Sequence, residues 1–313
     1  MRAVTIRSGE IHVDERPDPV PGLGEVVVKV AGAGLNGADL LQLRGAYPAP
    51  PGSPADIPGL ELAGTVAALG DGVTRFVVGD RVMGIVGGGG QAELATVHER
   101  QLMPVPPGLE LCDAGGFPET FTTAHDAVVV QAGLRPGERL LVHGGAGGVG
   151  TAAIQLASAM GASVVATTRH EQFDARLEAL GAEVVTRPAE HLGFGPFDVV
   201  LELIGGANLG EDVKALATGG RIAIVGVGGG IKAELNLLAL MSVRGRILGT
   251  TLRSRPLEEK AATARAVERE VLPLVERGRL VVPVDRRFPL DEAAAAYEHF
   301  RAGAKFGKVI IEF

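Results

Sequence analysis

Cysteine and aromatic residues are scarce in this 313-residue chain. Cys112 is the only cysteine, tryptophan is absent, and aromatic residues make up 4% of the sequence. A single thiol excludes an intrachain disulfide and any zinc site built from several cysteine ligands. Because a lone cysteine usually behaves as a small hydrophobic side chain, we expect Cys112 to be buried and not to act as a nucleophile.

Long apolar runs are also missing, and the charge balance is acidic. No uncharged apolar segment approaches the roughly 18 residues of a membrane helix, and the chain starts directly with a strand-like run, Met1–Ile6. We therefore expect a cytoplasmic protein with no membrane partner. The formal net charge of -7 argues against a nucleic acid as the main partner. The length suits two domains of about 150 residues each.

Glycine, in contrast, is abundant, and one group of glycines carries the main motif. The apolar run Leu140–Val142 leads into a glycine-rich turn, after which an apolar helical pattern begins at Thr151. In such a strand–turn–helix the first glycine makes the turn, the second admits a pyrophosphate, and the third lets helix and strand pack closely. The helix N-terminus would face the phosphates. The sequence therefore predicts a dinucleotide site at Gly145, Ala146, Gly147, Gly148, Val149 and Gly150.

Three more apolar runs follow this motif at the spacing of βα repeats. They cover residues 162–168, 197–203 and 221–226. The first lies at the roughly 20-residue spacing of a βαβ unit, so we predict an α/β fold with a doubly wound parallel Rossmann sheet. His143 precedes the glycine turn at a strand end, and we interpret it as a hydrogen-bonded or packed residue, not a catalytic one.

Residues 1–118 show a β-rich pattern instead. Apolar stretches at 26–30, 64–70, 79–84 and 94–97 are typical of strands bounded by turns. Residues 47–54 are too rich in proline for a helix or a central strand, which predicts a surface loop. We interpret the four glycines at 87–90 as a flexible linker, because no helix follows them as a phosphate loop would require.

Helical periodicity returns after Pro118. The pattern predicts a helix over 119–131, a long helix over 257–277 that ends at Gly278, and a short helix near 291–302. A last strand is expected at 308–313.

Several motifs, in this order along nearly the whole chain, resemble the medium-chain dehydrogenase/reductase superfamily. The match is to its zinc-free quinone oxidoreductase branch, the zeta-crystallin-like proteins. Residues 252–255 and 307–309 are most similar to the tumour-suppressor-inducible quinone oxidoreductase subgroup. The other stretches that carry the resemblance are 34–47, 58–64, 79–82, Pro118–Glu119, Thr123–Ala124 and 140–150.

The resemblance implies a fold, a site and an assembly. Residues 1–121 and 254–313 would form a GroES-like catalytic domain around a Rossmann domain of residues 122–253, with the active site in the cleft between them. The family pairs through the edges of its Rossmann sheets, which implies a homodimer or a dimer-based tetramer with residues 244–249 as the edge strand.

The resemblance also implies transfer of reducing equivalents from NADPH to a quinone. Zinc-containing members place a cysteine and a histidine where this chain has Asn36 and Leu60, so no catalytic zinc is expected and Glu61 would be structural. Asn36 and Tyr47 would line the acceptor side, and Thr123 would contact the nicotinamide. Tyr47 could stack on a quinone and donate a hydrogen bond, or it could anchor the proline-rich loop.

The end of the second Rossmann strand bears on the choice of cofactor. NAD sites carry an acidic residue there, whereas this strand ends in Thr168 and Arg169. Arg169 could pair with a 2′-phosphate, which favours NADPH, although Glu171 lies nearby. The family's usual lysine and tyrosine at this phosphate are not matched, and Arg187 could substitute for them. Further predicted cofactor contacts are Gly226, Thr250 and Arg253.

Two other functions remain open from the sequence. An NADPH-dependent enone or alkenal double-bond reductase would share nearly every motif and differ in its acceptor pocket. A non-catalytic NADPH-binding sensor would keep the nucleotide motif without turnover. Asn36, Tyr47 and Thr123 favour catalysis over the sensor.

Overall fold

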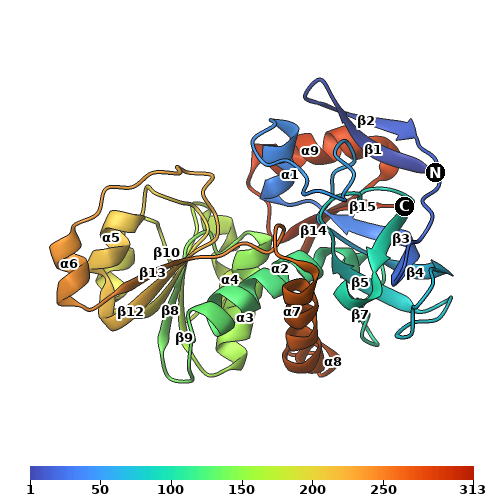
Figure 1. The fold of residues 1–313 in the computed structure, drawn as a ribbon. Helices are drawn as coiled ribbons and strands as arrows, with labels where there is room; N and C mark the ends of the chain where they lie inside the picture. Colours follow the sequence, from blue (N-terminus) through green and yellow to red (C-terminus); the bar gives the residue numbers. More distant parts are fainter. The chain divides into compact units, whose positions relative to one another are not determined.

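The computed structural model describes residues 1–313, which form two compact units (Figure 1). Unit 1 combines residues 1–122 with residues 252–313, and unit 2 is the segment 123–251 between them. The chain therefore begins unit 1, builds all of unit 2, and returns to complete unit 1.

Unit 2 contains a six-stranded sheet in which every neighbouring pair of strands is parallel. The order β10-β9-β8-β11-β12-β13 corresponds to 3-2-1-4-5-6 within the unit. This is the doubly wound order, in which ligands bind beyond the carboxyl ends of the strands. The predicted Rossmann fold is confirmed. Its strands are β8 (Arg139–Val142), β9 (Ser163–Thr167), β10 (Val184–Thr186), β11 (Phe197–Glu202), β12 (Leu216–Ile224) and β13 (Arg246–Gly249).

The helices of unit 2 follow the strands in alternation. The first, α3, is buried along all of residues 150–157, because its small and aliphatic side chains allow close packing on the sheet. The helix predicted over 119–131 changes type in the middle: α2 ends at Ala124, and residues 125–131 form a π-helix. The helices are α2 (Pro118–Ala124), which spans the unit boundary, α3 (Gly148–Ala159), α4 (Asp174–Ala179), α5 (Leu209–Lys214) and α6 (Leu237–Ser242).

Unit 1 is built on a seven-stranded sheet with the order β14-β15-β3-β4-β5-β7, and β6 also pairs with β3. All pairs are antiparallel except β14 with β15, so the last strands of the chain join the sheet begun by its first third. The strands are β3 (Glu25–Gly34), β4 (Glu61–Leu69), β5 (Arg81–Ile85), β6 (Leu94–His98), β7 (Leu102–Pro104), β14 (Val284–Pro289) and β15 (Lys308–Glu312), beside the hairpin β1 (Arg2–Arg7) and β2 (Glu10–Glu15).

The helix predicted over 257–277 is interrupted in unit 1. It divides at Val271, because Pro273 has no N–H to continue the ladder of hydrogen bonds. None of the helices in the chain is both long and apolar enough to span a lipid bilayer. The helices of unit 1 are α1 (Gly37–Leu43), α7 (Leu257–Glu270), α8 (Leu272–Glu276) and α9 (Ala293–Ala302).

The tetraglycine segment 87–90 differs from its prediction, whereas the proline-rich loop 47–54 lies at the surface as expected. Three of the four glycines are buried. A Cβ atom on Gly90 would lie 2.9 Å from the Glu61 carbonyl oxygen, and one on Gly87 would lie 2.2 Å from Ser53 Oγ. The prediction of a flexible linker was wrong, because these glycines allow close packing between backbone segments.

Candidate functional site

The glycine turn between β8 and α3 lies at the carboxyl edge of the unit 2 sheet. A Cβ atom on Gly150 would lie 2.5 Å from the Gly144 carbonyl oxygen, so the close approach of helix and strand requires glycine there. On Gly147 a Cβ would meet only that same oxygen, at 3.5 Å, which is an ordinary contact. Packing within the chain therefore does not require glycine at position 147, and the space beside it is compatible with the predicted approach of a pyrophosphate. Gly145 is buried, and the partly exposed residues of the turn are Ala146, Gly147, Gly148 and Val149.

The ends of β9 and β10 lie beside this turn, because β8, β9 and β10 are neighbours in the sheet. Thr168 is buried, and Arg169 is exposed with no hydrogen bond or ion pair to its guanidinium group. Arg187 has other partners: its two Nη atoms bind the two carboxylate oxygens of Asp174, and Nη1 also donates to the Thr168 carbonyl at 3.0 Å. The structure therefore gives Arg187 a role different from the predicted phosphate contact, since Asp174 already occupies its two-pronged donor face.

The residues after β12 and β13 that were predicted to contact the cofactor, Gly226 and Thr250, also make contacts within unit 2. A Cβ atom on Gly226 would lie 2.0 Å from the Leu203 carbonyl oxygen, so its own chain demands glycine there. Gly228 has open space where its Cβ would be, and it fits a close ligand better than Gly226 does. The Thr250 hydroxyl donates to Asp126 Oδ2 at 2.7 Å, which ties the end of β13 to the π-helix.

In unit 1 a buried polar cluster joins Asn36, Glu61 and Lys308. The Lys308 ammonium lies 2.6 Å from Glu61 Oε1 and donates to Asn36 Oδ1 at 2.8 Å and to the Leu35 carbonyl at 2.7 Å. Asn36 Nδ2 donates to Glu61 Oε1 at 2.9 Å, and the Glu119 N–H donates to Glu61 Oε2 at 2.8 Å. The Lys308 and Glu61 side chains are 3% and 0% exposed, so this is a fully desolvated ion pair whose polar atoms are hydrogen-bonded.

Asp39 on α1 extends this cluster. Its carboxylate accepts from the Asn36 N–H at 2.8 Å and the Gly59 N–H at 3.1 Å. Complete burial, with a smaller contribution from the negative charge of nearby Glu61, nevertheless raises the pKa of Asp39 to about 6. The hydrogen bonds and the Lys308 charge act in the opposite direction.

This raised pKa predicts a pH-dependent stability. Because the folded protein binds the Asp39 proton more tightly than the unfolded chain, the Asp39 contribution to stability is greatest below about pH 4 and decreases as the pH rises to about 6. The rise of the Asp39 pKa from 3.8 to about 6 corresponds to at most about 3 kcal/mol of stability. Urea unfolding of wild type and Asp39→Asn at several pH values measures it. The difference in unfolding free energy between wild type and Asp39→Asn should change between about pH 4 and pH 6 and stay constant above pH 6. A difference that is constant at every pH would contradict the raised pKa of Asp39.

Arg253 and Tyr47 form a second connection within unit 1. Arg253 is 4% exposed, and its guanidinium donates to the carbonyls of Gly87 and Tyr47 and to Gln42 Oε1, at 2.6–2.9 Å. It also lies over the Tyr47 ring, 4.9 Å from the centroid. Acceptors of unit 1, one of them in the proline-rich loop, therefore already bind the Arg253 guanidinium, a role that the prediction of a cofactor contact did not include. Tyr47 itself is held in place by this arginine.

Sequence reasoning missed two residues of the unit 1 cluster. Lys308 could have been suspected, because it is a single lysine at the start of the apolar strand β15. Asp39 gave a weaker signal, as one acid within the short α1.

Two other residues named from the sequence are buried. Thr123, on α2, is 7% exposed. Cys112 is buried, as predicted, and burial raises its pKa to about 12.

Comparisons with known proteins match both parts of the chain. Residues 22–107 match the alcohol dehydrogenase GroES-like domain family, and residues 159–311 match the zinc-binding dehydrogenase family. The quinone oxidoreductase of Rattus norvegicus is 32% identical over 304 residues, covering 94% of this chain and 90% of that protein. The chain belongs to the medium-chain dehydrogenase/reductase superfamily. The resemblance inferred from its motifs is confirmed.

The fold of this chain is similar to that of solved oxidoreductase structures over its full length. The quinone oxidoreductase of Thermus thermophilus, described with its NADPH complex, is 35% identical, with a TM-score of 0.86 and 100% coverage of both chains. An NAD-dependent alcohol dehydrogenase is 31% identical, with a TM-score of 0.87 and the same coverage. The protein is therefore an oxidoreductase that uses a nicotinamide cofactor.

Proposed function

We propose that the protein is an NADPH-dependent quinone reductase that works without a catalytic zinc ion. The observation that carries the proposal is the Lys308–Glu61–Asn36 cluster, together with relatives named as quinone oxidoreductases. A second candidate, an NADPH-dependent enone or alkenal reductase, has the same nucleotide motif and differs in the acceptor that it takes.

The residues at the expected zinc position do not fit a zinc ion. A catalytic zinc ion needs three protein ligands that include cysteine or histidine, whereas the positions of the cysteine and the histidine hold Asn36 and the buried, apolar Leu60. Glu61, the remaining oxygen donor, has an ammonium group 2.6 Å from its carboxylate. A second cation beside Lys308 would be repelled, so we derive no catalytic step through zinc.

NADPH fits the carboxyl edge of the unit 2 sheet. The N-terminus of α3 and the open side of Gly147 would bind the pyrophosphate, and Arg169 would bind the 2′-phosphate. When bound, NADPH supplies a hydride from its nicotinamide ring. Thr123 is proposed to contact the nicotinamide portion, and Thr168 the ribose region. The roles of Gly226 and Thr250 are to shape and brace the neighbouring turns.

Arg169 offers the sharpest test of the cofactor. We expect Arg169→Ala to lower the ratio of kcat/KM for NADPH over NADH by about tenfold or more, because one charge-assisted phosphate contact contributes about 1.5–3 kcal/mol. Arg135→Ala is the matched control, since Arg135 is also exposed but precedes β8 at the amino edge of the sheet. An unchanged ratio in Arg169→Ala would remove this residue from the phosphate site.

The acceptor side is proposed to rest on Tyr47, held in place by Arg253. A tyrosine ring can stack on a quinone, and its phenol can donate a hydrogen bond to a quinone oxygen. Asn36 contributes by positioning, because Glu61, Gly34 and Lys308 already bind its amide. Reduction of a quinone needs little acid catalysis, since aromatisation stabilises the reduced oxygens; no strong general acid is required of these residues.

Product analysis tests the acceptor class. The protein is incubated under anaerobic conditions with one equivalent of NADPH and either a quinone or an alkenal, and the products are separated and identified. We expect conversion of the quinone to its hydroquinone and little reduction of the alkenal. Rapid saturation of the alkenal double bond with slow quinone reduction would favour the second candidate. Tight NADPH binding without either product would indicate a sensor.

We also propose that the protein assembles as a homodimer through the edge of unit 2. The edge strand β13 pairs only with β12. Helix α6, which precedes β13, carries three exposed apolar side chains: Leu237, Leu238 and Met241 are 66%, 74% and 70% exposed. A monomer rarely leaves such a group of apolar side chains in contact with water. Light scattering of the purified protein should give twice the chain mass, or four times if dimers pair; the mass of a single chain would contradict this.

A further inference from the structure

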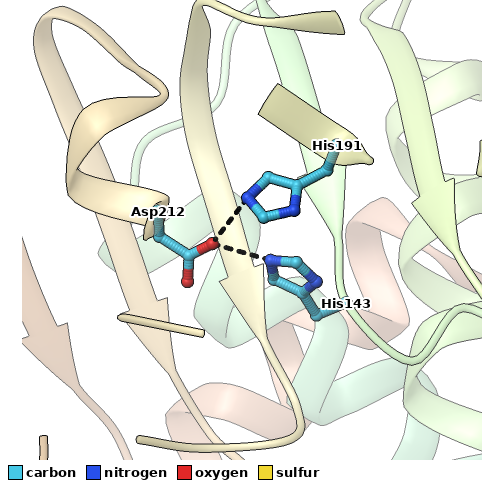
Figure 2. A group of neighbouring side chains, drawn as sticks. All are labelled: His143, His191 and Asp212. Carbon is cyan, nitrogen blue, oxygen red and sulfur yellow. Dashed lines mark hydrogen bonds and ion pairs between the residues drawn. The ribbon is translucent and has the colours of Figure 1, made fainter. Parts of the chain in front are cut away.

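A buried cluster of two histidines and a carboxylate lies inside unit 2, separate from the sites above. His143 directly follows the last residue of β8, His191 lies in a short 3₁₀ turn after β10, and Asp212 is on α5. All three are at most 2% exposed. Figure 2 shows both imidazole rings directed at the same oxygen of Asp212. His143 Nε2 is 2.7 Å from Asp212 Oδ1, and His191 Nε2 is 3.5 Å from it.

The hydrogen bonding of His191 leaves one ring nitrogen without a partner. Its Nδ1 lies 2.6 Å from the Pro188 carbonyl oxygen, which can only accept, so Nδ1 carries the proton. In the neutral ring Nε2 therefore presents a lone pair toward the Asp212 carboxylate. His191 Nε2 is buried and makes no hydrogen bond, and neither does Asp212 Oδ2. Two facing lone pairs in a dry interior repel each other, and a cation between them, a proton or a metal ion, removes that repulsion.

The charge of the surroundings points in the same direction. Glu202, at the end of β11, is also buried, and its Oε2 lies 4.0 Å from His143 Nε2. No lysine or arginine forms an ion pair with Glu202 or Asp212. The basic side chains beside these two carboxylates are those of His143 and His191, and with both imidazoles neutral the cluster carries a net negative charge that one divalent ion would balance.

We propose that His143 Nε2, His191 Nε2 and the Asp212 carboxylate bind a divalent transition-metal ion of the zinc type, with both Asp212 oxygens as donors. Two imidazoles and carboxylate oxygens are an established donor set for zinc. Metal-bound histidines usually donate their second nitrogen to a fixed acceptor, which the Pro188 carbonyl provides for His191. His143 Nδ1 lies 3.2 Å from the Thr167 hydroxyl, which also accepts from the Gly144 N–H. The ion would thus fix the strand end that carries the glycine turn.

This site has a structural role and does not depend on the proposed quinone reductase activity. It would join three segments of unit 2 that are far apart in sequence, and a bound metal adds its binding free energy to folding. Because the cluster is closed on all sides, the ion would enter as the chain folds, and brief treatment of the folded protein with a chelator should not remove it.

Metal analysis of protein without a polyhistidine tag tests the site. The chain is produced in medium supplemented with Zn²⁺ or Co²⁺, desalted, and measured for metal per chain by mass spectrometry. We expect about one ion per wild-type chain, with the intense visible absorption of four-coordinate Co²⁺ in the cobalt form. His191→Gln and Asp212→Asn should each retain less than about a tenth of that metal. His170→Gln, a histidine of the same unit that contacts Phe173, should retain all of it.

Each outcome decides the proposal. A wild-type chain without stoichiometric metal would overturn it, and so would full metal content in both His191→Gln and Asp212→Asn, because the ion would then lie elsewhere. If one variant fails to fold, the other variant and an anomalous scattering peak among the three wild-type side chains supply the answer.

Discussion

Replacing Lys308 with methionine is expected to destabilise the protein by about 3–5 kcal/mol, the cost of removing one partner of a buried ion pair. Glu61 would keep its donors from Asn36 and Glu119, but its charge would remain in the interior with no cation beside it. Methionine retains the length of the lysine chain, so the loss reports the charge more than the packing. Urea unfolding followed by circular dichroism gives the difference in free energy.

Lys305→Met is the matched control. Lys305 lies in the same C-terminal segment, over the ring of Phe300, and has no ion-pair partner. We expect its loss to cost no more than about 1 kcal/mol. In Lys308→Met, a second change of Glu61→Gln removes the uncompensated charge and should restore part of the stability. A loss below about 1 kcal/mol in Lys308→Met would show that the pair does not hold this region together.

The two glycines of the nucleotide turn are expected to respond in opposite ways to alanine. Gly147→Ala should weaken NADPH binding at least about tenfold, because its Cβ would stand where the pyrophosphate approaches. Its backbone angles suit alanine, and the change of helix cap costs about 1 kcal/mol at most. Titration calorimetry with NADPH measures the affinity, and thermal unfolding measures the stability.

Gly150→Ala provides the contrast within the same turn. Its Cβ would lie 2.5 Å from the Gly144 carbonyl oxygen and 2.8 Å from Gly145 Cα, both backbone atoms that cannot move aside cheaply. We expect a loss of about 1–3 kcal/mol or more in folding stability. Equal NADPH affinity in Gly147→Ala and wild type would contradict the assignment of this turn to the pyrophosphate.

Local patterns predicted most of the fold. The Rossmann strands follow apolar runs because a parallel sheet covered on both faces requires nearly continuous apolar strands. The glycine turn was found because one short segment supplies all of its residues. The break at Val271 was missed, although Pro273 marks it, because the helical charge pattern continues across it.

Contacts between distant residues were not predictable in the same way. Lys308 binds Asn36 across 272 positions, so no local spacing could indicate the pair. For the same reason Arg187 was predicted as a phosphate contact and Arg253 as a cofactor contact, and their partners within the chain were not foreseen. Their acceptors, at Gln42 and Asp174, become neighbours only in the folded units. The glycines at 87–90 similarly appeared flexible because the backbone that packs against them lies elsewhere in the sequence.

Steady-state NADPH oxidation with quinones and with enones or alkenals, repeated with NADH, tests the central claim most directly. We expect kcat/KM to be highest for the pair of NADPH and a quinone, at least about tenfold above NADH with the same quinone and above NADPH with any enone or alkenal. Faster turnover of enones or alkenals, or equal use of NADH, would contradict it.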